Sequence, residues 1–173
     1  MYLISLYFDE KTNKRIQDYI HTAASASHNY FMTEHNVPPH ITIAAFETLH
    51  IEDVRNSLQE IFANFSMFKL QWVSIGVFKS STLFIQPVLN QCLQELSVAI
   101  HEKLAEIPDT KINRFYQPFH WLPHTTIAKQ LNEEQLFLSF QALRKQFSMF
   151  EGKVVRVELA RKTPFEIIEI WEV

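Results

Sequence analysis

The chain has 173 residues, of which 47% are hydrophobic and 20% are charged. This composition excludes an intrinsically disordered chain and predicts one domain with a substantial core. The formal net charge of -3 argues against a protein that coats long duplex nucleic acid by neutralising its phosphates.

Cysteine content and hydropathy set expectations about the compartment. Cys92 is the single cysteine, so no internal disulfide can form and we expect a reducing, cytoplasmic setting. No apolar run approaches the about 20 residues of a membrane span, and residues 1–8 lack the basic flank and length of a signal peptide. We therefore expect no contact with a membrane. We also expect a monomer.

Apolar spacing alternates between the strand and the helix period along the chain. In chain order, the predicted elements are a strand at 2–8, a helix from 10 into the twenties, a strand at 40–46, a helix at 51–65, strands at 70–78 and 82–88, a helix at 89–104, a strand at 124–128, a helix at 132–147, and strands at 154–160 and 166–171. The order strand, helix, strand, strand thus occurs over 40–88 and again over 124–171. In the helix at 132–147, Asn132 with Gln135 three residues later indicates a capped start, and the predicted buried face is Leu136, Phe137, Phe140, Leu143 and Phe147.

The sequence contains an internal repeat at an offset of 84 residues. Residues 39–44, PHITIA, align with residues 123–128, PHTTIA, at five of six positions. FSMF at 65–68 recurs at 147–150 at an offset of 82, and the extra pair at 151–152 restores 84. We therefore predict a single domain over 1–173 with a repeat at approximately 39–88 and 123–172. The predicted fold is α+β and bilobal, with two antiparallel sheets backed by helices and a central cleft.

The repeated segment carries His and Thr two positions apart. On a strand, residues i and i+2 share a face, so His40 projects with Thr42, and His124 projects with Thr126. Two imidazoles can divide the proton transfers of phosphodiester cleavage near neutral pH, and threonine hydroxyls can donate to phosphate oxygens. A lone strand histidine beside a proline is usually only a half-buried polar residue, but packing gives no reason to repeat His with Thr. A metal site fits less well, since two histidines alone supply too few ligands for structural zinc.

These paired motifs, HITI at 40–43 and HTTI at 124–127, resemble those of the 2H phosphoesterase superfamily, which includes the 2′-5′ RNA ligase-like proteins. The resemblance covers nearly the whole chain. It implies a phosphodiesterase without a metal or other cofactor, acting on 2′,3′-cyclic phosphates, 2′-5′ linkages or related nucleotide phosphodiesters. It also implies that His124 activates water and His40 protonates the leaving oxygen, or the reverse, while Thr42 and Thr126 hold the phosphate.

One position departs from the family pattern. Many bacterial relatives carry an arginine where this chain has Lys129, five residues after His124. Lysine keeps the positive charge but loses bidentate geometry, so Lys129 is either a phosphate-binding residue or an ordinary surface lysine.

The segment 108–123 lacks a helical period and is rich in aromatic residues. Tyr116 and Trp121 are candidates to stack on a base, and Arg114 is a candidate to reach a phosphate. The alternative is that these rings close the bottom of a lobe.

The leading hypothesis is therefore a hydrolase acting on a nucleotide or a short RNA end through His40 and His124. The alternative is a binding module that uses the same cleft to recognise an RNA end or nucleotide without turnover. Base preference and the linkage cleaved do not follow from these residues.

Overall fold

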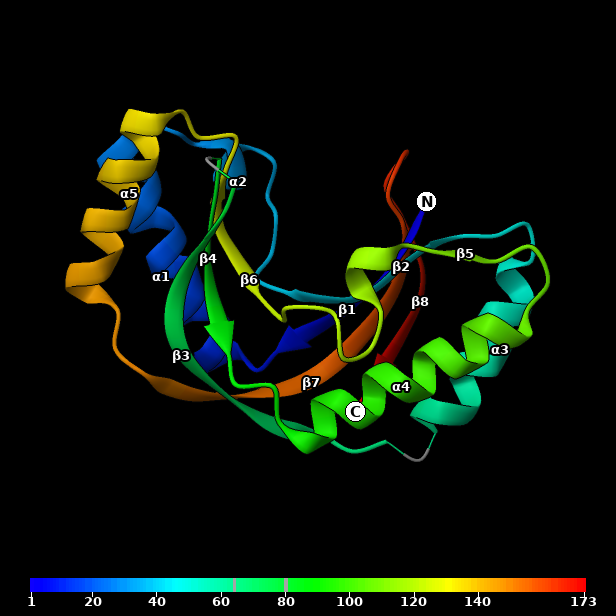
Figure 1. Cartoon of the computed structure of the whole chain (residues 1–173). Coiled ribbons are helices and arrows are strands. Elements are labelled where there is room, and N and C mark those ends of the chain that lie inside the picture. The colour runs from blue at the N-terminus through cyan, green and yellow to red at the C-terminus, as the bar shows by residue number, and fades with distance from the viewer. Residues whose placement is uncertain (64, 80) are drawn as a thin grey trace.

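Helices cover two ends of a curved sheet in this computed structural model, which describes every residue except 64 and 80 (Figure 1). The helices are α1 (Glu10–Ser27), α2 (Phe31–Glu34), α3 (Ile51–Phe62), α4 (Gln91–Glu106), α5 (Glu133–Gln146) and a 3-10 helix, η1 (Arg114–Tyr116). The strands are β1 (Tyr2–Phe8), β2 (Ile41–Glu47), β3 (Phe68–Phe78), β4 (Thr82–Pro87), β5 (Lys111–Ile112), β6 (Thr125–Lys129), β7 (Phe150–Arg161) and β8 (Glu166–Glu172). α1 packs on α5 at the left of Figure 1, and α3 packs on α4 at the lower right. The predicted α+β class is confirmed.

The described strands form one continuous sheet, which corrects the expectation of two separate sheets. Their order is β5-β2-β1-β7-β3-β4-β6, with β8 paired to β7 off this path, and every pairing is antiparallel. β7 joins β3, β4 and β6 to β1, β2 and β5: its residues 150–154 pair with β3, and its residues 154–161 pair with β1. Because β7 continues from one group of strands to the other, the hydrogen-bonded ladder has no gap between the two groups.

Side-chain caps set the starts of the long helices. Asp9 Oδ1 accepts a hydrogen bond from the backbone N–H of Thr12 at 3.0 Å, at the start of α1. Asn90 caps α4 in the same way. The predicted capping box of α5 is confirmed, since Asn132 and Gln135 each accept from the other's backbone N–H. Each cap satisfies a backbone donor that the helix itself cannot, which is worth about 1 kcal/mol.

The strand pairing at the joint fits the internal repeat. The order β2-α3-β3-β4 recurs as β6-α5-β7-β8. Where β3 meets β7, Lys69 lies opposite Lys153, the residue 84 positions later, and the flanking pairs are 68 with 154 and 70 with 152. This register is unchanged when the two strands are exchanged at that offset, as a local two-fold relation would require. The duplication itself stays a prediction.

The helices differ in how well their predicted faces are buried. On α3, Val54, Leu58 and Phe62 are buried, one face of the predicted helix at 51–65. On α5, however, Phe137 and Phe140 are 59% and 36% exposed, which corrects the predicted buried face. The reason is that α5 approaches α1 through small residues, with Ser139 Oγ donating to the Ala23 carbonyl oxygen at 3.3 Å, so the contact face is turned away from the two phenylalanines.

The helices also bear on the question of a membrane span. Within residues 1–63, 65–79 and 81–173, no helix combines the length and the apolar character that crossing a membrane requires.

Candidate functional site

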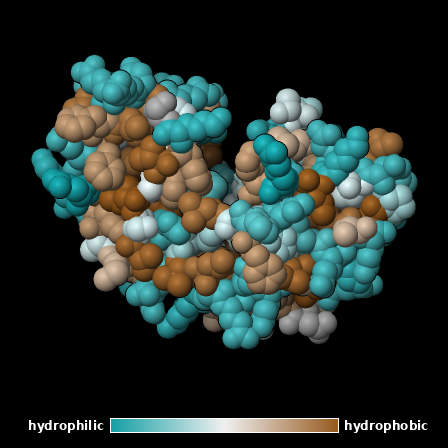
Figure 2. Space-filling model, viewed as in Figure 1, coloured by the Kyte–Doolittle hydropathy of each residue, from teal (hydrophilic) through white to brown (hydrophobic). Residues whose placement is uncertain are grey.

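A cavity of about 280 Å³ lies between β2 and β6 and receives side chains from both predicted motifs. In the space-filling view, the surface is hollowed between the part that contains α5 and the part that contains α4 (Figure 2). The lining residues are Met1, Leu3, His40, Thr42, Ala45, Asn113, Tyr116, His124, Thr126, Lys129 and Lys162. The fold therefore brings together six of the residues that the sequence analysis singled out, namely both histidines, both threonines, Tyr116 and Lys129.

A larger hollow beside α5, of about 860 Å³, is a poorer candidate. Its lining is mainly apolar, with Phe137 and Phe140, and its ionisable groups are Glu133 and Glu134. Carboxylates repel a phosphate, and phenylalanine transfers no proton. The smaller cavity is therefore the better candidate for phosphodiester chemistry.

Strand alternation sorts the motif residues between the cavity and the core. Ile41 and Ile43 are fully buried on the core side of β2, while Thr42 lines the cavity. On β6, the Thr125 hydroxyl accepts from the Trp72 indole N–H at 3.2 Å within the core, while Thr126 lines the cavity. This is the separation that the side-chain period of two predicts.

Each histidine is oriented by the backbone carbonyl two residues before it. His40 Nδ1 donates to the Pro38 carbonyl oxygen at 2.8 Å, and His124 Nδ1 donates to the Leu122 carbonyl oxygen at 2.9 Å. A carbonyl oxygen can only accept, so Nδ1 carries the proton in the neutral ring, and Nε2 is left with its lone pair. Both imidazoles can therefore exchange a proton at Nε2.

Burial keeps both imidazoles neutral in the free protein. Burial lowers the pKa of His40 and of His124 below the ordinary value of 6.5, while the hydrogen bonds to the Pro38 and Leu122 carbonyls act in the opposite direction. The positive charge of Lys129 lowers the pKa of His40 further, and the charge of protonated His40 does the same to His124. Each neutral ring can therefore accept a proton at Nε2, and an anion bound between the two rings would stabilise the protonated form.

A partly buried group of Tyr7, Arg156 and Glu158 lies beside His40. The rings of Tyr7 and His40 have centroids 5.9 Å apart, and the Arg156 guanidinium lies 4.8 Å from the centre of the Tyr7 ring. Arg156 also pairs with buried Glu158 at 3.0 Å. Burial, and then the negative charge of Glu158, raise the pKa of Tyr7, so it stays a neutral phenol. This network fixes the wall against which the His40 ring packs.

Two phenylalanines hold the ring of His124. Phe78 and Phe84 approach it edge-to-face, with centroids 4.7 and 5.4 Å from that of the imidazole. Gly76 lies opposite Phe84 in the sheet, and a Cβ at position 76 would overlap the Phe84 ring. A glycine is therefore needed for Phe84 to lie flat over β3 beside His124.

The cations of the cavity are Lys129 and Lys162. Lys129 is half-buried, with Nζ 4.6 Å from the centre of the Phe31 ring. Burial and then the charge of Lys162 lower the pKa of Lys129. The sequence analysis missed Lys162 because it lies far from both motifs. It reaches the cavity through pairing of β7 with β1, after which its backbone N–H donates to the Met1 carbonyl oxygen at 3.0 Å.

The aromatic segment after α4 contributes less than expected. Tyr116 lines the cavity, and burial raises its pKa, so it stays a hydrogen-bond donor. Arg114 is exposed and lies over the ring of Phe115, at 4.9 Å, rather than against the cavity. Trp121 is only 6% exposed and belongs to the hydrophobic core, which corrects its suggested part in base stacking. The segment thus both lines the cavity and closes the core.

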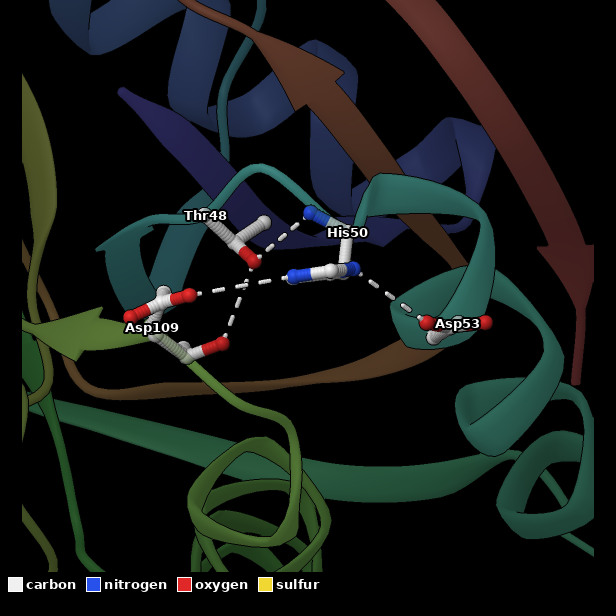
Figure 3. A network of polar contacts seen from close by, with 5 residues as sticks. Thr48, His50, Asp53 and Asp109 are labelled. Carbon is white, nitrogen blue, oxygen red and sulfur yellow. Dashed lines mark hydrogen bonds and ion pairs between the residues drawn. The ribbon is translucent and has the colours of Figure 1, made fainter.

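A polar network anchors this segment beside β2 (Figure 3). His50 lies between Asp53 and Asp109, with N–O distances of 3.7 and 3.9 Å, and Thr48 accepts from the His50 backbone N–H and hydrogen-bonds to Thr110. The contacts join the start of α3 to the loop that precedes β5. The network therefore helps to fix the stretch that carries Asn113 and Tyr116 into the cavity. No sequence pattern predicted it, since its members come from two separate loops.

Among the residues that the structure describes, no three or more His, Cys, Asp or Glu side chains gather so as to hold a metal ion.

The sequence matches the model of a known family. The model of the 2′-5′ RNA ligase superfamily matches residues 11–164. No curated protein sequence matches the chain.

Solved structures with low sequence identity share the fold. LigT from E. coli, complexed with 3′-AMP, superposes with a TM-score of 0.63 at 13% identity, covering 99% of this chain and 97% of that one. The TT0787 protein of Thermus thermophilus gives 0.63 at 11% identity, covering 99% and 96%. Usb1 from Kluyveromyces marxianus, with uridine monophosphate, gives 0.52 at 13% identity, covering 99% and 98%. With the family model spanning most of its length, this chain belongs to the 2′-5′ RNA ligase superfamily of 2H phosphoesterases.

Proposed function

We propose that this protein is a phosphodiesterase that needs no metal and cleaves a nucleotide or RNA-end phosphodiester, either a 2′,3′-cyclic phosphate or a 2′-5′ linkage. One observation carries the proposal: His40 and His124 line one small cavity, and each has its Nδ1 tied to a backbone carbonyl and its Nε2 left for proton transfer. The family membership and the nucleotide monophosphates named with LigT and Usb1 support a nucleotide ligand.

For a 2′,3′-cyclic phosphate, the two histidines would act on opposite sides of phosphorus. One imidazole removes a proton from water as the new O–P bond forms. The other donates a proton to the 2′ or 3′ oxygen as its bond to phosphorus breaks. Both rings are neutral in the free protein, so the acid must first take up a proton, which the negative phosphate favours.

The remaining side chains would stabilise charge on the phosphate. Thr42 and Thr126 donate hydrogen bonds to the non-bridging oxygens, where negative charge grows in the transition state. Lys129 adds a positive charge at short range without the bidentate geometry of arginine. Burial, with a smaller contribution from the charge of Lys129, disfavours the protonated form of His40; we assign His40 the role of base and His124 that of acid, one of the two orders that the family resemblance implied.

The test is release of nucleoside monophosphate from the four 2′,3′-cyclic mononucleotides in the presence of EDTA. His40→Ala and His124→Ala should each lower kcat by about 10² to 10⁴-fold, and the double variant should lose little more, because the pair acts as a unit. His21→Ala, an exposed histidine on α1, is the matched control and should leave kcat unchanged.

Other outcomes would point elsewhere. A strict requirement for added metal would contradict the proposed mechanism. Tight binding of nucleotides or RNA ends without any turnover would instead support the binding module.

A further inference from the structure

The positive charge of the cavity exceeds what one phosphodiester needs. Lys129 and Lys162 both line it, and the described lining residues include no carboxylate. A 2′,3′-cyclic phosphate carries a single negative charge, so one lysine suffices to balance it. The proposed two-histidine mechanism gives the second lysine, Lys162, no role.

Both lysines line the same cavity without an acidic partner among the described lining residues. Burial, and then the positive charge of Lys162, lower the pKa of Lys129. Across the part of the chain that the structure describes, neither lysine forms an ion pair, whereas the neighbouring Arg161 is held by Glu166 at 2.7 Å. Two like charges facing one hollow repel each other, and an anion placed beside them relieves this repulsion.

The strand register separates Lys162 from the first histidine motif along β1. Ser5 pairs with Thr42 on β2, while Met1, four residues earlier on the same chain segment, accepts the backbone hydrogen bond of Lys162. Four extended residues span about 13 Å, so Lys162 projects into the cavity from its far end. In agreement, the charge of Lys129 acts on His40, and the charge of Lys162 acts on Lys129.

We propose that Lys162 binds a second phosphate of the substrate, while the histidines, the threonines and Lys129 act on the reacting one. This inference rests on the proposed function and narrows it: the substrate class is a nucleotide with a 2′,3′-cyclic phosphate and one further phosphate on its 5′ side. That second phosphate belongs either to a 5′-phosphomonoester or to the internucleotide linkage of an RNA end. The cavity is at the small end of the range for ligand sites, about 300 Å³, and so accommodates one nucleotide unit rather than a long chain.

The experiment compares kcat/KM for three substrates that share the reacting group. They are adenosine 2′,3′-cyclic phosphate, its 5′-phosphorylated form, and the dinucleotide ApA with a terminal 2′,3′-cyclic phosphate. Wild-type protein should prefer at least one doubly charged substrate over the first by about 10-fold or more, as expected for a charge-assisted contact. Preference for the 5′-phosphorylated mononucleotide alone identifies a terminal phosphate, and preference for the dinucleotide identifies an internucleotide phosphate.

Variants assign the preference to Lys162. Lys162→Met should reduce the ratio to about one, and Lys162→Arg should retain most of it. Arg161→Met is the matched control, since it removes the adjacent cation, which is paired with Glu166, and should keep the ratio. A wild-type ratio near one, or an equal loss on all three substrates in Lys162→Met, would overturn the inference while leaving the phosphodiesterase intact.

A separate measurement covers the case in which no substrate is turned over. The proposed function then fails, and calorimetric binding of adenosine 3′,5′-bisphosphate is compared with that of 3′-AMP. Tighter binding of the bisphosphate that Lys162→Met abolishes would still support the second phosphate site. Equal affinities would reject it.

Discussion

The protonation of His40 and His124 is decided by a few atoms around each ring. A carbonyl two residues earlier in the chain fixes the tautomer, and burial favours the neutral form. The two sites differ in the charge that acts on each ring, since Lys129 acts on His40 and protonated His40 acts on His124. The pH dependence of activity should therefore respond to Lys129 through His40.

Removing the charge of Lys129 should raise the pKa of His40. In Lys129→Met the protonated ring loses a repulsive neighbour, so the limb of the kcat/KM profile that His40 controls should move to higher pH. The value of kcat/KM should also fall by about 10 to 100-fold, because the phosphate loses a charged partner. NMR titration of the His40 ring, with Lys145→Met on α5 as control, measures the shift directly. An unchanged pKa of His40 would contradict the electrostatic role of Lys129.

At the scale of elements, the pairing of β3 with β4 places Phe84 opposite Gly76 and against the ring of His124. The two glycines of the chain, Gly76 and Gly152, both lie in strands beneath a side chain that occupies the space of the missing Cβ. Above Gly76 this is Phe84, which contacts His124, and above Gly152 it is Thr12 of α1. At both glycines a side chain therefore fills the space of a Cβ, but only the side chain above Gly76 contacts a candidate catalytic histidine.

Adding a methyl group at these glycines should separate stability from activity. Gly76→Ala and Gly152→Ala should each lower the free energy of unfolding by about 1 to 3 kcal/mol, because the core is overpacked. Only Gly76→Ala should also lower kcat, by up to about 100-fold, since a displaced Phe84 moves the His124 ring. Urea unfolding and turnover of the same preparations measure both effects. Equal kcat in the two variants would exclude a positioning role for Phe84.

For the whole molecule, buried neutral histidines couple folding to pH. His40, His101 and His124 each have a pKa lowered chiefly by burial, and His101 donates from Nδ1 to the Ser97 carbonyl oxygen inside α4. Below about pH 6.5 the unfolded chain binds protons that the folded chain does not. The stability that these groups confer is therefore complete above this pH and decreases as the pH falls through it.

The free energy of unfolding should thus decrease between pH 7 and pH 5, with a slope of up to about 1.4 kcal/mol per pH unit for each histidine. His101→Leu should reduce this slope without touching the cavity. The exposed His21 provides the control, since His21→Gln should leave the slope unchanged. Urea midpoints measured across this pH range test both, and identical slopes in His101→Leu and wild type would contradict the linkage.

Much of the site was predictable because the same short motif occurs twice, and strand alternation assigns its residues to faces without knowledge of the fold. His40, Thr42, His124 and Thr126 were identified in this way, and Lys129 was identified by comparison with the family pattern. Periodicity likewise predicted the strand at 2–8, and the Asn132–Gln135 spacing predicted the capped start of α5, since both depend on residues that are neighbours in the chain.

Tertiary structure decided what depends on contacts between distant segments. Lys162 enters the cavity only through the pairing of β7 with β1, and Trp121 is drawn into the core although its neighbours are exposed. The single continuous sheet likewise depends on β7 pairing with β3 at one end and β1 at the other. Local sequence determines the period and the caps of an element, but which elements meet, and which side chains then share a cavity, is set by long-range packing.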